Sequence, residues 1–150
     1  MTGIGGRPSG EARGAVEPAM PSPTRDVGTT EPVPDDRTRR RALGGIAGPV
    51  AFVAAWLVTG AVTAGYDPLA DAISRLAAVA APTRPAMTLG FVVFGFAVGA
   101  HAIALRRVLP GPAWMAVLVC AGATLAVAAT PLGGGLDGLH GAAAGLAYMA

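Results

Sequence analysis

Three long runs of uncharged, mostly apolar residues follow one another after residue 41, and they restrict the possible fold more than any other feature. They cover residues 42–64, 86–105 and 113–132, and contain 23, 20 and 20 residues. Because a helix rises about 1.5 Å per residue, each run is long enough to cross a hydrocarbon core of about 30 Å. Only 13% of the residues are charged and 53% are hydrophobic, which is unusual for a soluble domain. The runs predict an all-α, polytopic transmembrane helix bundle.

A fourth apolar run occupies residues 140–150 and is too short to span a bilayer. Pro131 and the glycines at 133–135 separate it from the third run and predict a turn. We expect either that this run begins a fourth transmembrane helix of a longer protein, or that it lies at the membrane interface. The sequence therefore predicts three full spans and a partial fourth.

The first 41 residues have a different composition from the rest of the chain. They are rich in Gly, Pro, Ser, Thr and charged residues, and nearly free of aromatic and branched apolar residues. Such a segment cannot bury enough apolar surface to offset the entropy lost on ordering. The composition predicts a disordered N-terminal tail over residues 1–41.

The positions of the arginines predict how the spans are oriented. Four arginines lie directly before the first run, at positions 37, 39, 40 and 41, and Arg106 and Arg107 follow the second run. The segment between these runs holds only Arg75 and Arg84. Because arginines are retained on the cytoplasmic side, this asymmetry predicts a multi-pass protein of the cell membrane with a cytoplasmic N-terminus. Residues 65–85 and 133–139 would then share the outer face.

Two features of the first run leave alternatives open. Pro49 lies inside it, so the helix either begins near Gly48 or kinks at the proline, which lacks a backbone donor. The segment around Arg39 and Arg40 is similar to a twin-arginine export signal, with residues 62–64 as a possible cleavage site. The length of the run and the further spans favour an uncleaved transmembrane helix.

The segment from Gly65 to Leu76, GYDPLADAISRL, holds most of the polar groups between the first two runs. If Pro68 opens a short helix, Asp71 lies three residues before Ser74 and four before Arg75, so an ion pair and a hydroxyl share one face. The apolar residues would then face the membrane: Leu69, Ala72, Ile73 and Leu76. This pattern predicts an amphipathic helix at the interface that caps the bundle.

The outer loops also carry the candidate site residues. Asp67, Asp71, Ser74, Asp137 and His140 would lie at one outer mouth, where carboxylates and an imidazole can hold a metal ion or activate water. The candidates for catalysis are Asp67, Asp71, Ser74 and His140, and the weaker candidates for metal binding are Asp71 and His140. No HExxH motif, helical histidine pair or cysteine pair accompanies them. We therefore expect no bound cofactor.

The two histidines are predicted to lie far apart. His101 falls near the cytoplasmic end of the second run and His140 at the outer face, which separates them by about 20 Å and excludes their joint ligation of one haem iron. We expect His101 to be a hydrogen-bonded polar residue of the bundle. Cys120, the single cysteine, is expected to be a small packing residue.

Glycines recur at four-residue spacing in three of the apolar runs. Such pairs allow helices to approach closely, either within one bundle or between copies in a homo-oligomer. The pairs are Gly44 and Gly48, Gly95 and Gly99, and Gly141 and Gly145. The expected partner of the chain is the lipid bilayer, and no motif for nucleic-acid binding occurs.

Four stretches of the chain carry a further signal: IAGPVAF, GYDPLADAISRLAA, MTLGFVVFGFAVGAHAIALRR and LHGAAAGLAY. Together they resemble a bacterial membrane family known as domain of unknown function 998, and the resemblance covers residues 43–150. It implies about six helices, a first outer loop with an Ile-Ser-x-Leu motif, and a histidine entering the fourth helix. The motif positions are then occupied by Asp67, Pro68, Asp71, Ile73, Ser74, Leu76 and His140. The chain ends before the fifth and sixth helices, and the family name carries no activity.

Three functions are compatible with these features. The first hypothesis is a non-enzymatic membrane component whose outer loop helix caps the bundle and which binds or regulates a partner. The alternative is an outer-face membrane enzyme, a hydrolase of lipid-linked substrates, that uses Asp67, Asp71 and His140. A transporter ranks last, because it calls for a broken or charged helix at mid-membrane, and only Pro49 and His101 offer one.

Overall fold

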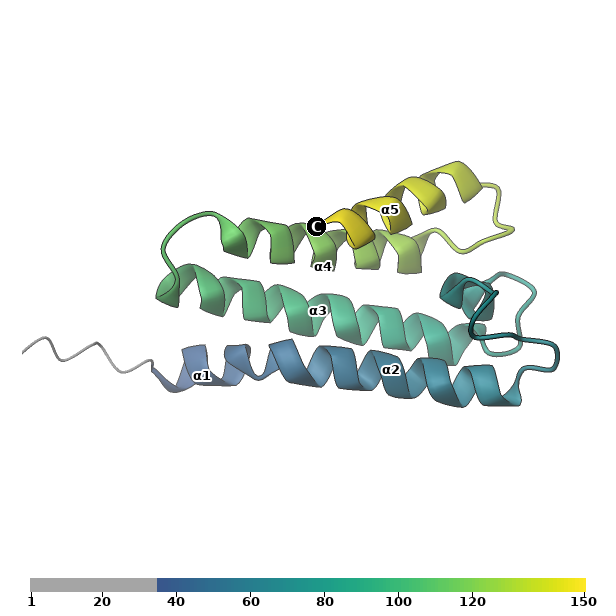
Figure 1. Ribbon diagram of the computed structural model, residues 1–150, viewed down its shortest axis with the longest axis horizontal. Coiled ribbons are helices and arrows are strands. Elements are labelled where there is room, and N and C mark those ends of the chain that lie inside the picture. Colours follow the sequence, from purple (N-terminus) through teal and green to yellow (C-terminus); the bar gives the residue numbers. More distant parts are fainter. Residues whose placement is uncertain (1–34) are drawn as a thin grey trace, which may run out of the picture. The chain divides into compact units, whose positions relative to one another are not determined.

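The computed structural model describes residues 35–150, and every regular element within that range is helical. Five α-helices and one short 3₁₀-helix follow one another along these described residues (Figure 1). They are α1 (Asp36–Ala42), α2 (Gly44–Val62), η1 (Ile73–Ala77), α3 (Arg84–Val108), α4 (Ala113–Ala129) and α5 (Asp137–Met149). The prediction of an all-α chain is confirmed.

The helices form a bundle in which α3 is central. It packs against α2 on one side and α4 on the other, and α5 folds back along α4 (Figure 1). The largest fully buried side chains are Leu76 in η1 and Met87 in α3. They belong to one apolar cluster with Ala77, Phe91, Val127 and Ala143. The core therefore lies where the 65–83 loop meets the ends of α3, α4 and α5.

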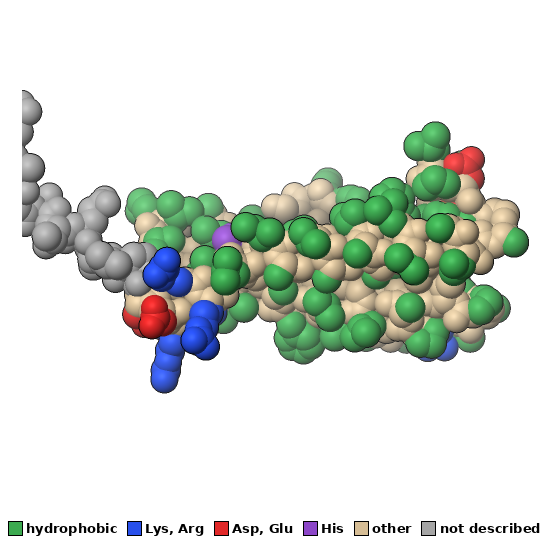
Figure 2. All heavy atoms as spheres, turned by 90° about the horizontal axis from the view of Figure 1, so that it is seen from below, with side chains coloured by type: hydrophobic (Ala, Val, Ile, Leu, Met, Phe, Trp, Pro, Cys, Tyr) green, Lys and Arg blue, Asp and Glu red, His purple; other side chains and the backbone are tan. Residues whose placement is uncertain are grey.

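Within residues 35–150, two helical stretches are long and apolar enough to cross a membrane by length and composition. One is the stretch of 27 residues from Asp36 to Val62, which comprises α1 and α2, and the other is the 25-residue α3. Only 11% and 33% of their most apolar windows are buried in the bundle, whereas the core helix of a soluble protein is mostly covered. Figure 2 shows hydrophobic side chains along the length of one face, with the charged side chains near its two ends.

The helix α4 is shorter than the third apolar run. It ends at Ala129, and its 17 residues amount to about 26 Å at 1.5 Å per residue. Pro131 disfavours helical torsion angles at the residue before it, and Thr130 accordingly has φ −119° and ψ 70°. The prediction that the helical segment continues to Leu132 is wrong for this reason. Helix α4 is apolar but shorter than the two stretches that are long enough to cross a membrane.

The predicted disordered tail is wrong at its C-terminal end, because residues 36–42 form α1. The Asp35 side chain accepts a hydrogen bond of 2.8 Å from the Thr38 amide and caps this helix. Arginines 39–41 fill its last turn, where cations interact favourably with the helix dipole. Local capping and charge placement, which a composition argument overlooks, account for the error. Residues 1–34 lie outside the described residues.

A turn at Leu43 separates α1 from α2, and α2 continues through Pro49. The alternative in which the helix begins near Gly48 is therefore wrong. At the junction, the His101 ring donates a hydrogen bond of 3.0 Å from Nδ1 to the Ala42 carbonyl. Gly45 leaves room for the ring, since a Cβ there would lie 2.8 Å from it. The expectation that His101 is a hydrogen-bonded residue of the bundle is confirmed.

Two of the three glycine pairs lie at helix contacts. A Cβ on Gly48 would lie 3.1 Å from the Ala97 Cβ, and one on Gly95 would lie 2.5 Å from the Leu125 Cγ. These glycines allow α3 to approach its two neighbours closely. By contrast, apart from chain neighbours and the backbone of the same helix, no described atom lies within 4 Å of a Cβ built on Gly141 or Gly145. The described residues therefore make no close helix contact at this last pair, and its role in packing stays a prediction.

Candidate functional site

The predicted loop helix starting at Pro68 is replaced by a turn and a later 3₁₀-helix. The Asp67 carbonyl accepts a hydrogen bond of 2.8 Å from the Asp71 amide. Ala72 is then extended, with φ −65° and ψ 137°, and η1 begins only at Ile73. The extended residue rotates the two halves of the segment relative to each other. Leu69 is therefore 97% exposed while Leu76 is only 1% exposed, and the two do not share one face.

Asp71 nevertheless forms the predicted ion pair with Arg75. Its other carboxylate oxygen accepts a hydrogen bond of 2.9 Å from the Asp67 amide. The hydrogen bond to the Asp67 backbone and, after it, the bond to Arg75 hold the pKa of Asp71 below its usual value. The Asp67 carboxylate accepts in turn from the Leu69 amide at 2.9 Å. Both carboxylates therefore serve to shape the loop.

His140 lies in a second local arrangement, between α4 and α5. Its side chain is 3% exposed, and its Nδ1 is 2.5 Å from the Thr130 carbonyl oxygen. Because a carbonyl only accepts hydrogen bonds, Nδ1 carries the proton. The other ring nitrogen, Nε2, is buried and has no hydrogen-bond partner among residues 35–150. Asp137, one turn earlier, accepts a hydrogen bond of 2.7 Å from the Gly133 amide.

The five predicted site residues do not gather at one point. Asp67 and Asp71 shape the first loop, Asp137 shapes the second, and His140 is inside the bundle. Within the described part of the chain, no group of three or more His, Cys, Asp or Glu residues is arranged to hold a metal ion. The described residues therefore do not bring these side chains together as a cluster, because Asp67, Asp71, Asp137 and His140 each bond to nearby backbone groups.

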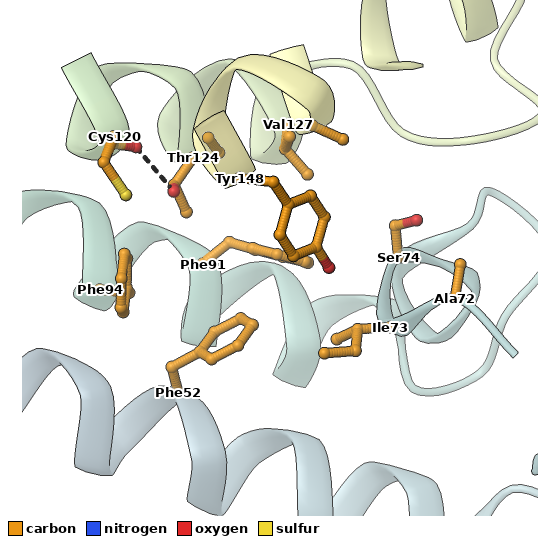
Figure 3. A pocket seen from close by; sticks show the side chains of 12 residues that line it. Phe52, Ala72, Ile73, Ser74, Phe91, Phe94, Cys120, Thr124, Val127 and Tyr148 are labelled. Atoms are coloured by element: carbon orange, nitrogen blue, oxygen red, sulfur yellow. Dashed lines mark hydrogen bonds between the residues drawn. The ribbon is translucent and has the colours of Figure 1, made fainter. Parts of the chain in front are cut away.

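The fifth of these residues, Ser74, lines a cavity of about 280 Å³ that is partly open at the surface. We call it the aromatic cavity. It lies between α2, α3, α4, α5 and residues 72–74 (Figure 3). Its lining residues are Phe52, Ala72, Ile73, Ser74, Phe91, Phe94, Cys120, Thr124, Val127, Ala144, Ala147 and Tyr148. Phe52 packs against Phe91 and Phe94, with ring centroids 5.1 Å and 5.4 Å apart.

Sequence reasoning missed this cavity, although part of its pattern can be seen in the sequence. Phe91 and Phe94 are three residues apart on α3, and Cys120, Thr124 and Val127 follow helical spacing on α4, so each set shares one helix face. Which faces meet depends on the bundle arrangement, which one sequence does not reveal. Cys120 is half-buried beside the cavity.

The fold and these sites define the class of the protein as an all-helical bundle with long apolar helices. A family model described as "Protein of unknown function (DUF998)" matches residues 46–150. The chain belongs to this family, as its resemblance predicts. No curated protein and no solved structure matches the chain.

Proposed function

We propose that the protein is a non-enzymatic, multi-pass component of the cell membrane, and that its 65–83 loop caps the outer end of the bundle. The observation that carries the proposal is the use of Asp67, Asp71 and His140 in hydrogen bonds to neighbouring backbone groups. A catalytic acid or base needs access to a substrate proton. These groups stabilise loops and helix ends instead.

The contacts of the loop support its role as a cap. Leu76 inserts into the core, and the Thr83 hydroxyl donates a hydrogen bond of 2.9 Å to the Leu76 carbonyl. The Val79 amide donates to the Leu132 carbonyl at 2.9 Å, which joins the loop to the α4–α5 connection. The indole N–H of Trp56 donates to the Tyr66 hydroxyl at 2.9 Å and ties the start of the loop to α2.

Membrane insertion is supported by the exposed apolar surface. Large side chains on α2 and α3 are open to the surroundings: Ile46, Val50, Leu57, Val58, Leu89 and Phe96. In water such a surface favours aggregation, whereas in a bilayer it contacts lipid tails. The arginines of α1 and those at 106 and 107 lie at the opposite end of the bundle from the loop, which favours a cytoplasmic N-terminus.

One observation favours the enzymatic alternative. A histidine whose Nδ1 donates to a backbone carbonyl is oriented as metal-ligating histidines are, and Nε2 of His140 has an unused lone pair. An outer-face hydrolase would need this nitrogen to bind a metal ion or accept a proton. Among the described residues, no group of three or more His, Cys, Asp or Glu side chains that could hold a metal ion includes His140.

Metal analysis of the purified full chain separates the two functions. We expect elemental analysis to find no stoichiometric metal and the visible spectrum to contain no haem band. A stoichiometric metal that is lost in His140→Ala but retained in His101→Ala would overturn the non-enzymatic proposal. The His101 variant is the matched control. That imidazole also binds a backbone carbonyl, but it lies near the C-terminal end of α3, away from the 65–83 loop.

A further inference from the structure

We propose that the aromatic cavity binds one hydrocarbon chain of an outer-leaflet phospholipid. This inference rests on the proposed insertion into the membrane and adds a ligand to it. The cavity is bounded by four helices and by residues 72–74 of the capping loop (Figure 3). The cavity is partly open, and Tyr148 in its lining is 84% exposed. A hydrocarbon chain can therefore enter from the surface of α5.

The lining of the cavity selects an apolar ligand. No charged side chain occurs among the described residues that line it. The Thr124 hydroxyl already donates a hydrogen bond of 2.8 Å to the Cys120 carbonyl in its own helix. A charged group that entered would lose its hydration without compensation. Three phenylalanine rings instead offer a surface that hydrocarbon can contact.

The volume of the cavity suits a single chain. An apolar protein cavity of about 150 Å³ stays dry in water and binds benzene. The aromatic cavity measures about 280 Å³, nearly twice that size, and it therefore holds roughly ten to twelve carbon atoms of a chain. The remainder of a longer chain can leave through the open side.

The depth of the cavity matches one leaflet. Phe94 lies ten residues after the first residue of α3, Arg84, which is about 15 Å along the helix. Cys120 lies nine residues before the end of α4 at Ala129, which is about 14 Å. Both distances are close to half of the hydrocarbon core of about 30 Å. The cavity thus extends from the capping loop to the depth at which an outer-leaflet chain ends.

Polarity along the cavity sets the direction of the lipid. Ser74 lies at the loop end, and the Tyr148 hydroxyl points toward the side of the cavity formed by Ile73 and Ser74 (Figure 3). Phe94 and Cys120 form the deep end. A phospholipid has hydrogen-bonding ester groups at one end of its chain, which places those esters near the hydroxyls and the methyl end near Phe94.

The test reconstitutes the full chain in phosphatidylcholine vesicles that contain a phosphatidylcholine with a photoactivatable diazirine in its acyl chain. After illumination, mass spectrometry locates the attached lipid. We expect the label to concentrate on the segments around Phe52, Phe94 and Cys120. In Ala144→Phe, which fills the cavity, this label falls about tenfold, equivalent to about 1.4 kcal/mol of lost binding. Ala142→Phe, at an exposed position of the same helix, keeps it.

Alkylation of Cys120 by a small membrane-permeant maleimide checks that Ala144→Phe is folded. A folded variant with a filled cavity is alkylated more slowly than the native protein, whereas an unfolded variant is alkylated faster. If Ala144→Phe is alkylated faster, Ala147→Phe is used in its place. Label that is spread evenly over lipid-facing residues, or label that is unaffected by either filling variant, overturns the lipid-binding inference alone. Absence of label from the entire chain overturns membrane insertion as well.

Discussion

The imidazole of His140 donates a hydrogen bond to the backbone carbonyl of Thr130, and the two atoms are 2.5 Å apart. Thr130 caps the C-terminus of α4, which ends at Ala129, and Pro131 follows it. The histidine therefore satisfies a buried carbonyl at a helix end and holds α5 against α4. Thr130 and His140 are 6% and 3% exposed, so water does not readily replace this bond.

Replacing His140 by alanine is expected to destabilise the fold by about 1–3 kcal/mol, because the Thr130 carbonyl is left buried without its donor. His140→Asn should lose less, since its amide nitrogen can occupy the position of Nδ1. Urea unfolding in detergent micelles, followed by tryptophan fluorescence, measures both. His101→Ala is the control and should cost about 0.5–1.5 kcal/mol, because its bond is more accessible to solvent. Equal losses for the two alanine variants would contradict the role assigned to His140.

Alanine at two glycines is expected to have opposite effects. In a helix interior alanine is more favourable than glycine by up to about 1 kcal/mol. A Cβ on Gly44 would collide with the backbone carbonyl of Ala97, which cannot move aside as a flexible side chain can. Gly44→Ala should therefore lower the midpoint of thermal unfolding in detergent. At Gly122 the new Cβ would meet no described atom within 4 Å apart from chain neighbours and the backbone of its own helix, so Gly122→Ala should leave the midpoint unchanged or raise it.

The sequence predicts the helices well because a membrane-length apolar run is a long and strongly biased signal. The sequence-based prediction is wrong where a single residue sets the local backbone conformation. Asp35 extends order into the predicted tail, Pro131 ends α4 early, and the extended Ala72 divides the loop. Each of these effects is local, whereas composition averages over many residues.

The candidate site was predicted less well, for a different physical reason. Asp71 and Arg75 are close in sequence, so their pairing follows from spacing alone. Their loop partners and the burial of His140 depend on how α4, α5 and the loop pack. Phe52 and Tyr148 line the same cavity from distant parts of the chain. Contacts of this kind are set by the bundle arrangement, which neither residue reveals by itself.

The turn at Asp67 and Asp71 is expected to weaken in acid. The lowered pKa of Asp71 means that its ionised form is favoured in the folded loop. The carboxylate therefore stabilises the turn when the pH is above 3.8, the ordinary pKa of the group. This stabilisation is lost as pH falls through the lower pKa of the folded state. Hydrogen exchange of the Asp67 amide, corrected for its intrinsic pH dependence, should therefore show less protection below about pH 3.8.

Asp71→Asn provides the control for this titration. The amide cannot ionise, so the protection of the Asp67 amide should be lower than in the native protein at neutral pH and should not change with acid. Protection in the native protein that stays constant from neutral pH to pH 2 would show that the carboxylate does not hold the turn.

The orientation of the bundle gives the last prediction. Six arginines lie near the end that includes α1 and the C-terminus of α3, against Arg75 and Arg84 at the loop end, and the positive side is expected to be cytoplasmic.

Ala70 is exposed in the capping loop. In Ala70→Cys, an impermeant thiol reagent added to intact cells should label the new cysteine. The native Cys120, half-buried at the deep end of the aromatic cavity, should remain unlabelled and serves as the internal control. Labelling of Ala70→Cys only after lysis would place the loop in the cytoplasm, and the aromatic cavity would then open toward the inner leaflet.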